Sequence, residues 1–267
     1  ILYKTTLEVI FIMPSHYPLI DAHTHLGSDS ERSERQKKQI LSLVCASTPP
    51  EAEALLKTAK PYLLPTAGLH PWQASYFVND MLPYLTACPV IGEIGMDSVW
   101  CDVPLDRQEE VFRAQLAIAC QMKKPVILHT KGEEDRIASI LPEYPNPYLI
   151  HWYSCEEYLD QYLALGCYFS IGPDVLWNPP VRTLAARVPQ NRILIETDGM
   201  GAVKWAYEAP EAPKNSQLAD ARENTKNVED ALTHTLLETA AIRQTEPGVL
   251  AKQIQKNLIW GFLSASK

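Results

Sequence analysis

The sequence lacks paired cysteine motifs, and the scatter of its cysteines argues against a disulfide framework. Its six cysteines are scattered and none forms a Cys-x-x-Cys pair. Several lie within apolar runs such as "LSLVCAS" and "AIACQM". We interpret them as buried thiols of a protein in a reducing compartment, and we expect a cytoplasmic location. The cysteines are Cys45, Cys88, Cys101, Cys120, Cys155 and Cys167.

Long apolar runs and excess positive charge are also missing. No run reaches the length of a membrane span, and the first residues lack the basic and apolar pattern of a signal peptide, so no membrane partner is expected. Lys and Arg number 24 against 32 Asp and Glu, which gives a net charge of −8. This balance disfavours broad, non-specific binding of duplex nucleic acid. Nor does the sequence suggest an obligate protein partner.

The composition is that of a globular protein, and short apolar runs alternate with helix-length segments. The chain has 267 residues, of which 46% are hydrophobic and 21% charged. Several of the runs are continuously apolar, as in strands buried on both faces of a parallel sheet. The runs predict strands at 17–23, 39–47, 62–70, 88–97, 124–130, 147–153, 167–172 and 192–198.

The segments between these strands predict helices, the clearest over 107–123 because its apolar residues recur at i, i+3 and i+4. A polar, Pro-containing loop is expected from Gly199 to Asn224. The alternation predicts an α/β fold, a TIM (β/α)8 barrel. We expect residues 1–12 to be an N-terminal extension and 13–267 a single hydrolase domain. The other predicted helices are 51–60, 75–87, 133–141, 156–165, 180–188, 226–242 and 247–263.

Metal-ligand side chains stand at the ends of five predicted strands. In "LIDAHTHLG", two histidines are separated by one residue, so both point to the same side of a strand. The active site of such a barrel lies at the C-terminal strand ends. Imidazoles and carboxylates inside apolar runs are costly to bury unless they are paired or bind a metal. The candidate ligands are His23, His25, Glu93, His129, His151 and Asp198.

This ligand set is sufficient for two divalent ions, of which Mg²⁺, Mn²⁺ and Zn²⁺ are candidates. His23, His25 and Asp198 would hold one ion, and His129 and His151 the other. Glu93 has two carboxylate oxygens and could bridge the ions. Such ions activate water and polarise a phosphoryl or carbonyl group. Asp198 could then accept the proton of the nucleophile, and we assign catalytic roles to Asp198 and Glu93.

The motifs in their order along the chain resemble those of the TatD-like metal-dependent hydrolases, the TatD DNase family of the amidohydrolase superfamily. The resemblance covers about residues 18–263 and rests on "DAHTHL", "GLHPW", "IGEIGMD", "KKPVILHT", "IHWYS" and "ILIETD". It implies a TIM barrel, a centre of one or two metals, and phosphodiester hydrolysis of the deoxyribonuclease type.

The chain departs from the family around the expected substrate pocket. Lys131 stands where the family usually has Arg, "HWYSC" replaces an "HCFSG"-like motif, and "GMGAVKW" replaces an Ala-Pro-Tyr-like run. The resemblance therefore supports the metal chemistry of the family more firmly than it supports DNA as the substrate. We assign substrate binding to His70, Lys131 and Trp152. The alternatives are a histidine held by a turn, a solvated lysine and an aromatic that only packs.

The leading hypothesis is a metal-dependent phosphodiesterase that acts on a small phosphodiester or a nucleic-acid end. One alternative is an amidohydrolase of a carboxylic ester, lactone or amide, because the same ligands can polarise a carbonyl group. Another is a binding protein on a degenerate barrel. Trp72 and Tyr153 are expected to pack, and Asp97 is expected to orient a metal ligand.

Overall fold

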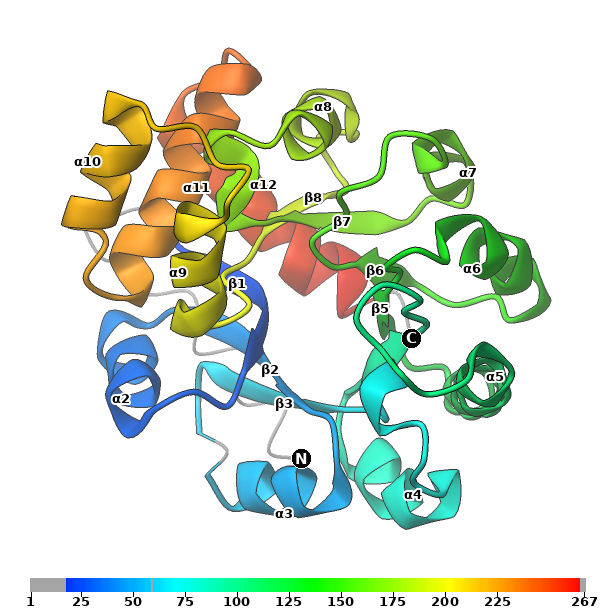
Figure 1. The fold of residues 1–267 in the computed structure, drawn as a ribbon. Helices are drawn as coiled ribbons and strands as arrows, with labels where there is room; N and C mark the ends of the chain where they lie inside the picture. The colour runs from blue at the N-terminus through cyan, green and yellow to red at the C-terminus, as the bar shows by residue number, and fades with distance from the viewer. Residues whose placement is uncertain (1–17, 59, 265–267) are drawn as a thin grey trace.

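The structure, a computed structural model, describes residues 18–58 and 60–264, so the expected extension at 1–12 lies outside the described residues. One eight-stranded parallel sheet runs in chain order from β1 to β8 and curves into a barrel (Figure 1). The predicted (β/α)8 barrel is confirmed. The strands are β1 (Ile20–His25), β2 (Leu41–Ala46), β3 (Leu63–Ala67), β4 (Val90–Gly95), β5 (Val126–His129), β6 (Tyr148–Ile150), β7 (Tyr168–Ile171) and β8 (Ile193–Ile195).

Helices surround the barrel, and the predicted ones are present with ends shifted by a few residues. They cover the outer face of the sheet, and the side chains of its inner face fill the barrel. Both faces are therefore buried, and every residue of β2 and β4 is buried. Within the described residues, no helix combines the length and apolarity that crossing a membrane requires. The helices are α2 (Asp29–Lys38), α3 (Pro49–Thr58), α4 (Val78–Ala87), α5 (Leu105–Met122), α6 (Glu134–Ile140), α7 (Leu159–Ala164), α8 (Pro179–Arg187), α9 (Met200–Glu208), α10 (Ser216–Asn224), α11 (Val228–Ile242) and α12 (Pro247–Lys256), with short 3₁₀ helices η1 (Pro71–Gln73), η2 (Leu141–Glu143) and η3 (Pro173–Leu176) and the π-helix η4 (Asn257–Phe262).

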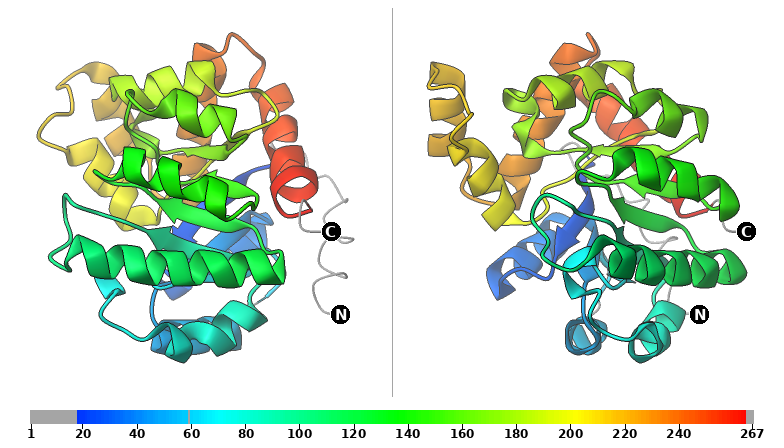
Figure 2. Two further views of the ribbon diagram at one scale, coloured as in Figure 1. Left: turned by 90° about the vertical axis from the view of Figure 1, so that its right-hand side faces the viewer. Right: turned by 45° about the vertical axis from the view of Figure 1, so that its right-hand side comes forward.

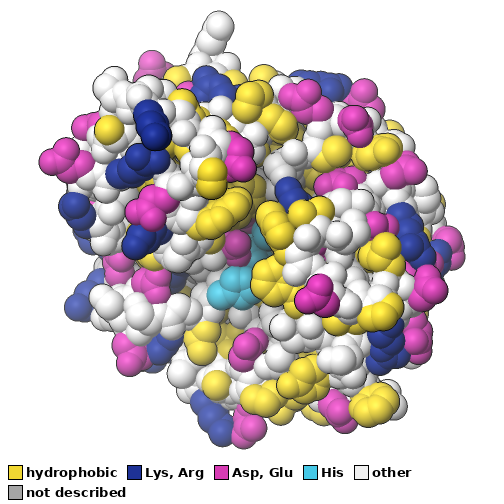
Figure 3. Space-filling view, viewed as in Figure 1, with side chains coloured by type: hydrophobic (Ala, Val, Ile, Leu, Met, Phe, Trp, Pro, Cys, Tyr) yellow, Lys and Arg dark blue, Asp and Glu magenta, His cyan; other side chains and the backbone are white. Residues whose placement is uncertain are grey.

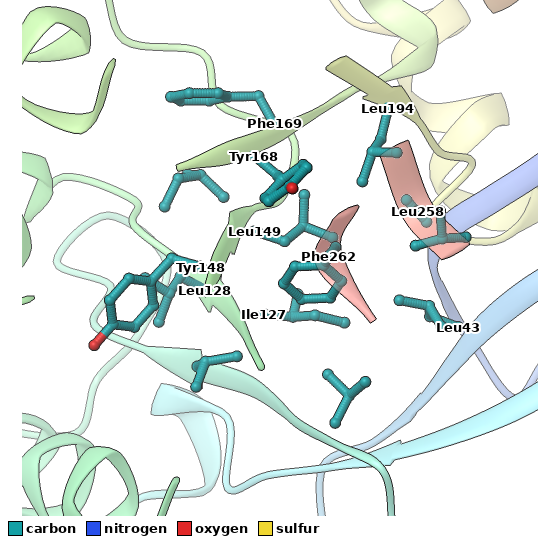
Figure 4. Close-up of a cluster of buried hydrophobic side chains, with 14 of the residues drawn as sticks. Leu43, Ile127, Leu128, Tyr148, Leu149, Tyr168, Phe169, Leu194, Leu258 and Phe262 are labelled. Carbon is teal, nitrogen blue, oxygen red and sulfur yellow. The ribbon is translucent and has the colours of Figure 1, made fainter. Parts of the chain in front are cut away.

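The C-terminal segment η4 closes the N-terminal end of the barrel. Asn257 donates from Nδ2 to the carbonyl oxygens of Gln190 and Ile193, each at 2.8 Å, and Ile193 begins β8. Figure 4 shows Phe262 and Leu258 among the side chains of the strands, and both are fully buried. This end is therefore filled with apolar side chains, and the opposite end is left for a site.

The gap between the first and last strands is joined by side chains as well as backbone. The Asp198 backbone N–H donates to the His23 carbonyl oxygen at 3.1 Å. Asp21 accepts from the Thr197 backbone N–H at 2.9 Å and from its hydroxyl at 2.6 Å. Arg35 donates to the same Asp21 carboxylate at 2.6 Å, with both side chains buried. This network holds the ends of β1 and β8 together and so sets His23 beside Asp198.

The loop predicted from Gly199 to Asn224 is wrong, because this segment contains helices α9 and α10. Its prolines lie between the two helices, and its glycines precede α9 or lie in the first turn of α9. Apolar residues of α9 such as Val203 and Tyr207 pack against Leu176 of η3 and Leu218 of α10. Figures 1 and 2 show the two helices beside α11, outside the ring that surrounds the barrel.

Helix α2 was not predicted either, because it lacks an apolar face. Its one buried residue is Arg35. The helix is stabilised at its start by a capping box, in which Ser28 accepts from the Glu31 backbone N–H and Glu31 accepts from the Ser28 backbone N–H. Acidic residues in its first turn and basic residues in its last turn also favour it. These local signals do not depend on hydrophobic periodicity.

Candidate metal centre

The six candidate ligands come together at the C-terminal end of the barrel. In Figure 3 the histidines lie at the bottom of a hollow near the centre of this face, with hydrophobic side chains along its edge. His23 and His25 reach the hollow from alternate positions of β1, and Glu93 reaches it from β4. His129 ends β5, whereas His151 and Asp198 lie just beyond β6 and β8.

Three of the ligands form one group around the Asp198 carboxylate. His23 Nε2 and His25 Nε2 lie 3.3 and 3.4 Å from Asp198 Oδ1. Glu93 Oε2 is 3.4 Å from His23 Nε2 and 3.9 Å from His25 Nε2. These distances bring imidazole nitrogens and carboxylate oxygens around one point, and these residues are the ones that the sequence analysis assigns to the first ion.

The second group forms around the other oxygen of Glu93. His151 Nε2 is 2.6 Å and His129 Nδ1 2.8 Å from Glu93 Oε1. His70 Nε2 is 3.5 Å from the same oxygen. Glu93 thus turns one oxygen toward each group, which is the arrangement that a carboxylate bridging two ions requires.

The residues present fit a divalent metal on the evidence of their own polar atoms. His23 Nε2 and Asp198 Oδ1 are buried and have no hydrogen-bond partner among the described residues. Buried polar atoms are rarely left unsatisfied, so each such atom calls for an explanation. In groups such as His23, His25 and Asp198, the candidate ligand atoms all lie within 4.8 Å of one another. A mixed set of imidazole and carboxylate donors suits Zn²⁺ or Mn²⁺, and the carboxylates suit Mg²⁺.

The charges of the two groups depend strongly on one another. Burial alone raises the pKa of Glu93, but the imidazoles of His151 and His70 hold it well below its ordinary value. Burial and His151 lower the pKa of His23, but the carboxylates of Glu93 and Asp198 outweigh them and raise it to about 9. The pKa values of His129 and His151 are raised as well, so without a metal, protons on these imidazoles supply the positive charge that balances the carboxylates. Divalent cations would replace those protons.

Asp97 orients His129, as the sequence predicted. Its Oδ2 lies 3.0 Å from His129 Nε2 and accepts the hydrogen bond of that ring N–H, which would leave Nδ1 to bind a metal. Asp97 is itself held by the backbone N–H groups of Val99 and Trp100, each 2.8 Å from its Oδ1. Burial raises the pKa of Asp97, but these hydrogen bonds and His129 lower it far more.

Glu196 is the buried residue that the sequence analysis missed. Its Oε1 lies 3.6 Å from His151 Nδ1, and its Oε2 accepts from the Ser170 hydroxyl at 2.7 Å. It therefore faces His151 as Asp97 faces His129. The signal was present in "ILIETD", where a carboxylate ends an apolar run two residues before Asp198.

The three predicted substrate-binding residues line a cavity of about 910 Å³ next to the ligands. His70 lies three residues beyond the end of β3, at the N-cap of η1. Its Nδ1 accepts a hydrogen bond from the Trp72 backbone N–H at 3.2 Å. Lys131 Nζ lies 4.7 Å from the centre of the Trp100 ring. Trp152 donates from Nε1 to Asp174 at 2.8 Å.

Two aromatic residues expected to pack have different surroundings. Tyr153 is buried and its ring contacts those of Tyr162 and Phe169, with centroids 5.4 and 5.8 Å away, so packing is confirmed. Trp72 is 48% exposed and lines the cavity, which contradicts a packing role. It lies at the surface because its indole N–H donates to Asp97, at 2.8 Å, instead of entering the core.

A TIM barrel with clustered imidazoles and carboxylates at the C-terminal strand ends defines the class of metal-dependent hydrolases. The model of the family described as "TatD related DNase" matches residues 20–262 of the chain. The chain belongs to this family, and the resemblance seen in the sequence motifs is confirmed.

Individual relatives agree with this assignment. The chain is 29% identical over 214 residues to the 3'-5' ssDNA/RNA exonuclease TatD of Rahnella sp. (strain Y9602), covering 75% of this chain and 77% of the relative. It is 25% identical over 202 residues to the metal-dependent hydrolase YabD of Bacillus subtilis (strain 168), covering 67% and 79%. The crystal structure of YJJV, a TatD homologue from Escherichia coli, shares the fold, with a TM-score of 0.73 and 21% identity over 92% of this chain and 98% of that one.

Proposed function

We propose that this protein hydrolyses phosphodiester bonds with two divalent ions, at unpaired nucleic-acid ends or in small nucleotide-like substrates. The observation that carries the proposal is the position of Glu93, whose Oε1 faces His129 and His151 while its Oε2 faces His23. The names of the relatives, ssDNA/RNA exonuclease among them, support phosphodiesters as the substrate.

We assign the ligands to the two ions from their contacts. His23, His25 and Asp198, whose ligand atoms lie within 4.8 Å of one another, would hold one ion. His129 and His151, which both face Glu93 Oε1, would hold the other, with Glu93 between the ions. When bound, such ions lower the pKa of water and polarise the phosphoryl oxygens.

Asp198 is suited to accept the proton of the attacking water on its carboxylate. Burial raises the pKa of Asp198, but the nearby imidazole of His23 lowers it below its ordinary value. The group is therefore ionised at neutral pH and able to take up a proton transiently.

His70 is suited to donate a hydrogen bond to a phosphate oxygen. Its Nδ1 accepts from the Trp72 backbone, which leaves the proton on Nε2, the atom that faces Glu93 and the cavity. Burial lowers the pKa of His70, so the ring is neutral and this tautomer is retained. Lys131 would add one positive charge at the same cavity.

Glu93→Gln tests the proposal most directly. The change keeps the size of the side chain but removes the negative charge shared by both groups, so at least one ion should be lost. We expect kcat/KM for a short single-stranded oligonucleotide to fall by roughly a thousandfold or more, since losing activated water forfeits several kcal/mol and ~1.4 kcal/mol is tenfold in rate. EDTA should abolish the wild-type activity, and Mg²⁺ or Mn²⁺ should restore it.

The matched control is Glu211→Gln, an exposed carboxylate that lines the same cavity. It should keep both the metal content, measured by elemental analysis, and the rate. A Glu93→Gln protein that cleaves at the wild-type rate would refute the mechanism. A wild-type protein that opens lactones or amides and cleaves no phosphodiester would refute the substrate class.

A further inference from the structure

Tryptophan is concentrated at the cavity to an extent that metal chemistry does not require. The sequence has six tryptophans, and five of them line the cavity that holds the candidate ligands. Trp100 and Trp205 are 52% and 53% exposed, so they do not serve the core. Large aromatic side chains left open in a cavity are typical of binding sites. The five are Trp72, Trp100, Trp152, Trp177 and Trp205.

Three of these rings form a row, which we call the aromatic wall: Trp100, Trp205 and Trp152. The ring centroids of Trp100 and Trp205 are 6.1 Å apart, and those of Trp205 and Trp152 are also 6.1 Å apart. Both pairs meet edge to face, at 82° and 72°. Trp205 belongs to α9 and Trp152 follows β6 directly beside His151, so the wall extends from the ligands to the mouth of the cavity.

The wall is held in place by specific contacts. The Trp152 indole N–H donates to Asp174 at 2.8 Å, and its ring lies so close to Gly172 that a Cβ there would approach it to 2.7 Å. The Trp177 indole N–H donates to the Ala206 carbonyl oxygen at 3.0 Å and so ties η3 to the helix that carries Trp205. The rings are therefore ordered before a ligand arrives, which reduces the entropy lost on binding.

The charge around the cavity disfavours recognition of a phosphate backbone by basic side chains. Lys131 is the one Lys or Arg among the described residues that line the cavity, and its ammonium group already lies over Trp100. The carboxylates of Glu51, Glu134 and Glu211 line the same cavity. A polyanion would gain little there, whereas a flat neutral ring can stack on indole without any charge.

We propose that the aromatic wall stacks on an unpaired base of the nucleotide next to the scissile bond, which makes base-bearing single-stranded ends the preferred substrates. The inference rests on the proposed phosphodiesterase function and names the substrate class of the same site. A base inside a duplex is already stacked and paired, and moving it onto the wall would cost unpairing energy.

The test compares two single-stranded oligonucleotides with identical phosphates, one ending in thymidines and the other in abasic tetrahydrofuran residues. Stacking of one base on an aromatic side chain typically changes affinity by about tenfold or more. We expect the wild type to cleave the base-bearing end with kcat/KM at least tenfold above that of the abasic end. Trp205→Ala should bring the ratio of the two values close to one.

Two further variants separate stacking from folding. Trp205→Phe keeps a ring and should restore most of the preference, whereas Trp260→Ala, at an exposed tryptophan outside the cavity, should behave as wild type. Binding is measured independently by quenching of tryptophan fluorescence in EDTA, where the thymidine oligonucleotide should bind more tightly than the abasic one. Equal cleavage and equal binding of the two oligonucleotides would refute the proposal that a base stacks on the aromatic wall. Failure to cleave either one with metal present would instead refute the phosphodiesterase function.

Discussion

At the scale of single residues, Asp174 links the stability of the fold to pH. It lies in η3, only 3% exposed. Burial raises the pKa of its carboxyl group to about 6, although hydrogen bonds from Asn178 and Trp152 lower it in part. The folded protein therefore holds this proton more tightly than the unfolded chain, whose Asp pKa is about 3.9. With respect to this group, the free energy of unfolding is highest below about pH 4 and falls as the pH rises to about 6.

Asp174→Asn should remove this pH-dependent penalty, which is on the order of 3 kcal/mol for a shift of about two pKa units. The amide oxygen of Asn can still accept from Trp152, and Asn178 can rotate to present its own oxygen to the new NH₂ group. Urea unfolding at pH 5 and 7.5 measures the effect. We expect the variant to gain free energy of unfolding relative to the wild type, and we expect this gain to be larger at pH 7.5 than at pH 5. Asp102→Asn, at an exposed residue, is the control, and equal shifts for the two variants would contradict the assignment.

The sequence predicted some residues of the site and not others for a physical reason. His23, Glu93 and His129 are polar residues inside apolar runs, and burial of such residues is costly without a partner, so their recurrence at successive strand ends marks them as a set. The part played by Trp205 depends on its contacts with Trp100 and Trp152, which come from other parts of the chain. Contacts of this kind arise only when the barrel closes.

At the scale of elements, two helices end on residues in a left-handed conformation that glycine adopts more easily. Gln39 caps the C-terminus of α2 with φ 57°, and Lys123 caps that of α5 with φ 52°. The backbone N–H of Lys123 donates to the carbonyls of Ala119 and Cys120, which fixes this geometry. An L residue is strained there because its Cβ crowds the backbone, at a cost of roughly 1–2 kcal/mol.

Lys123→Gly should therefore raise the free energy of unfolding, by about 0.5–1 kcal/mol after the larger entropy of glycine in the unfolded chain is subtracted. Lys123 is exposed, so no packing is lost. Gln121→Gly, at an exposed position inside the same last turn, should lower stability by about 1 kcal/mol. If the φ of residue 123 is the cause, chemical denaturation should show changes of opposite sign in the free energy of unfolding of the two variants. A decrease in the free energy of unfolding of both variants would contradict this explanation.

Elements were predictable where they bury an apolar pattern of their own. The strands and α5 have such patterns, and all were found. Helix α9 was taken for a loop because its short apolar set lies between glycines and prolines. Val203 and Tyr207 are buried only because η3, α10 and α11 supply the surface that covers them. Tertiary packing thus decided the structure of a segment whose local sequence is ambiguous.

At the scale of the whole molecule, the net charge of −8 governs how a nucleic acid can approach. Figure 3 shows acidic and basic side chains interspersed over the face that holds the site, with no continuous basic track leading to the hollow. Binding that neutralises many phosphates would require such a track. Affinity should therefore arise in the cavity, from the metal centre, Lys131 and the aromatic wall, and involve one or two nucleotides.

The activity should accordingly depend weakly on salt and on substrate length. For single strands, each phosphate neutralised by a basic side chain contributes a slope of about −0.7 to a plot of log affinity against log salt concentration. With Lys131 as the one such residue lining the described cavity, we expect a slope of magnitude below about one for log(kcat/KM) between 50 and 200 mM KCl at fixed Mn²⁺. Lys131→Ala should bring the slope close to zero while leaving the metal content unchanged. Oligonucleotides of 4 and 20 residues should be cleaved with similar kcat/KM values per end, about equal within a factor of two or three, because the described face offers no basic track beyond the cavity. A slope near −3, or activity that rises steeply with length, would show that the surface binds an extended backbone, and the recognition argued from the cavity would then be wrong.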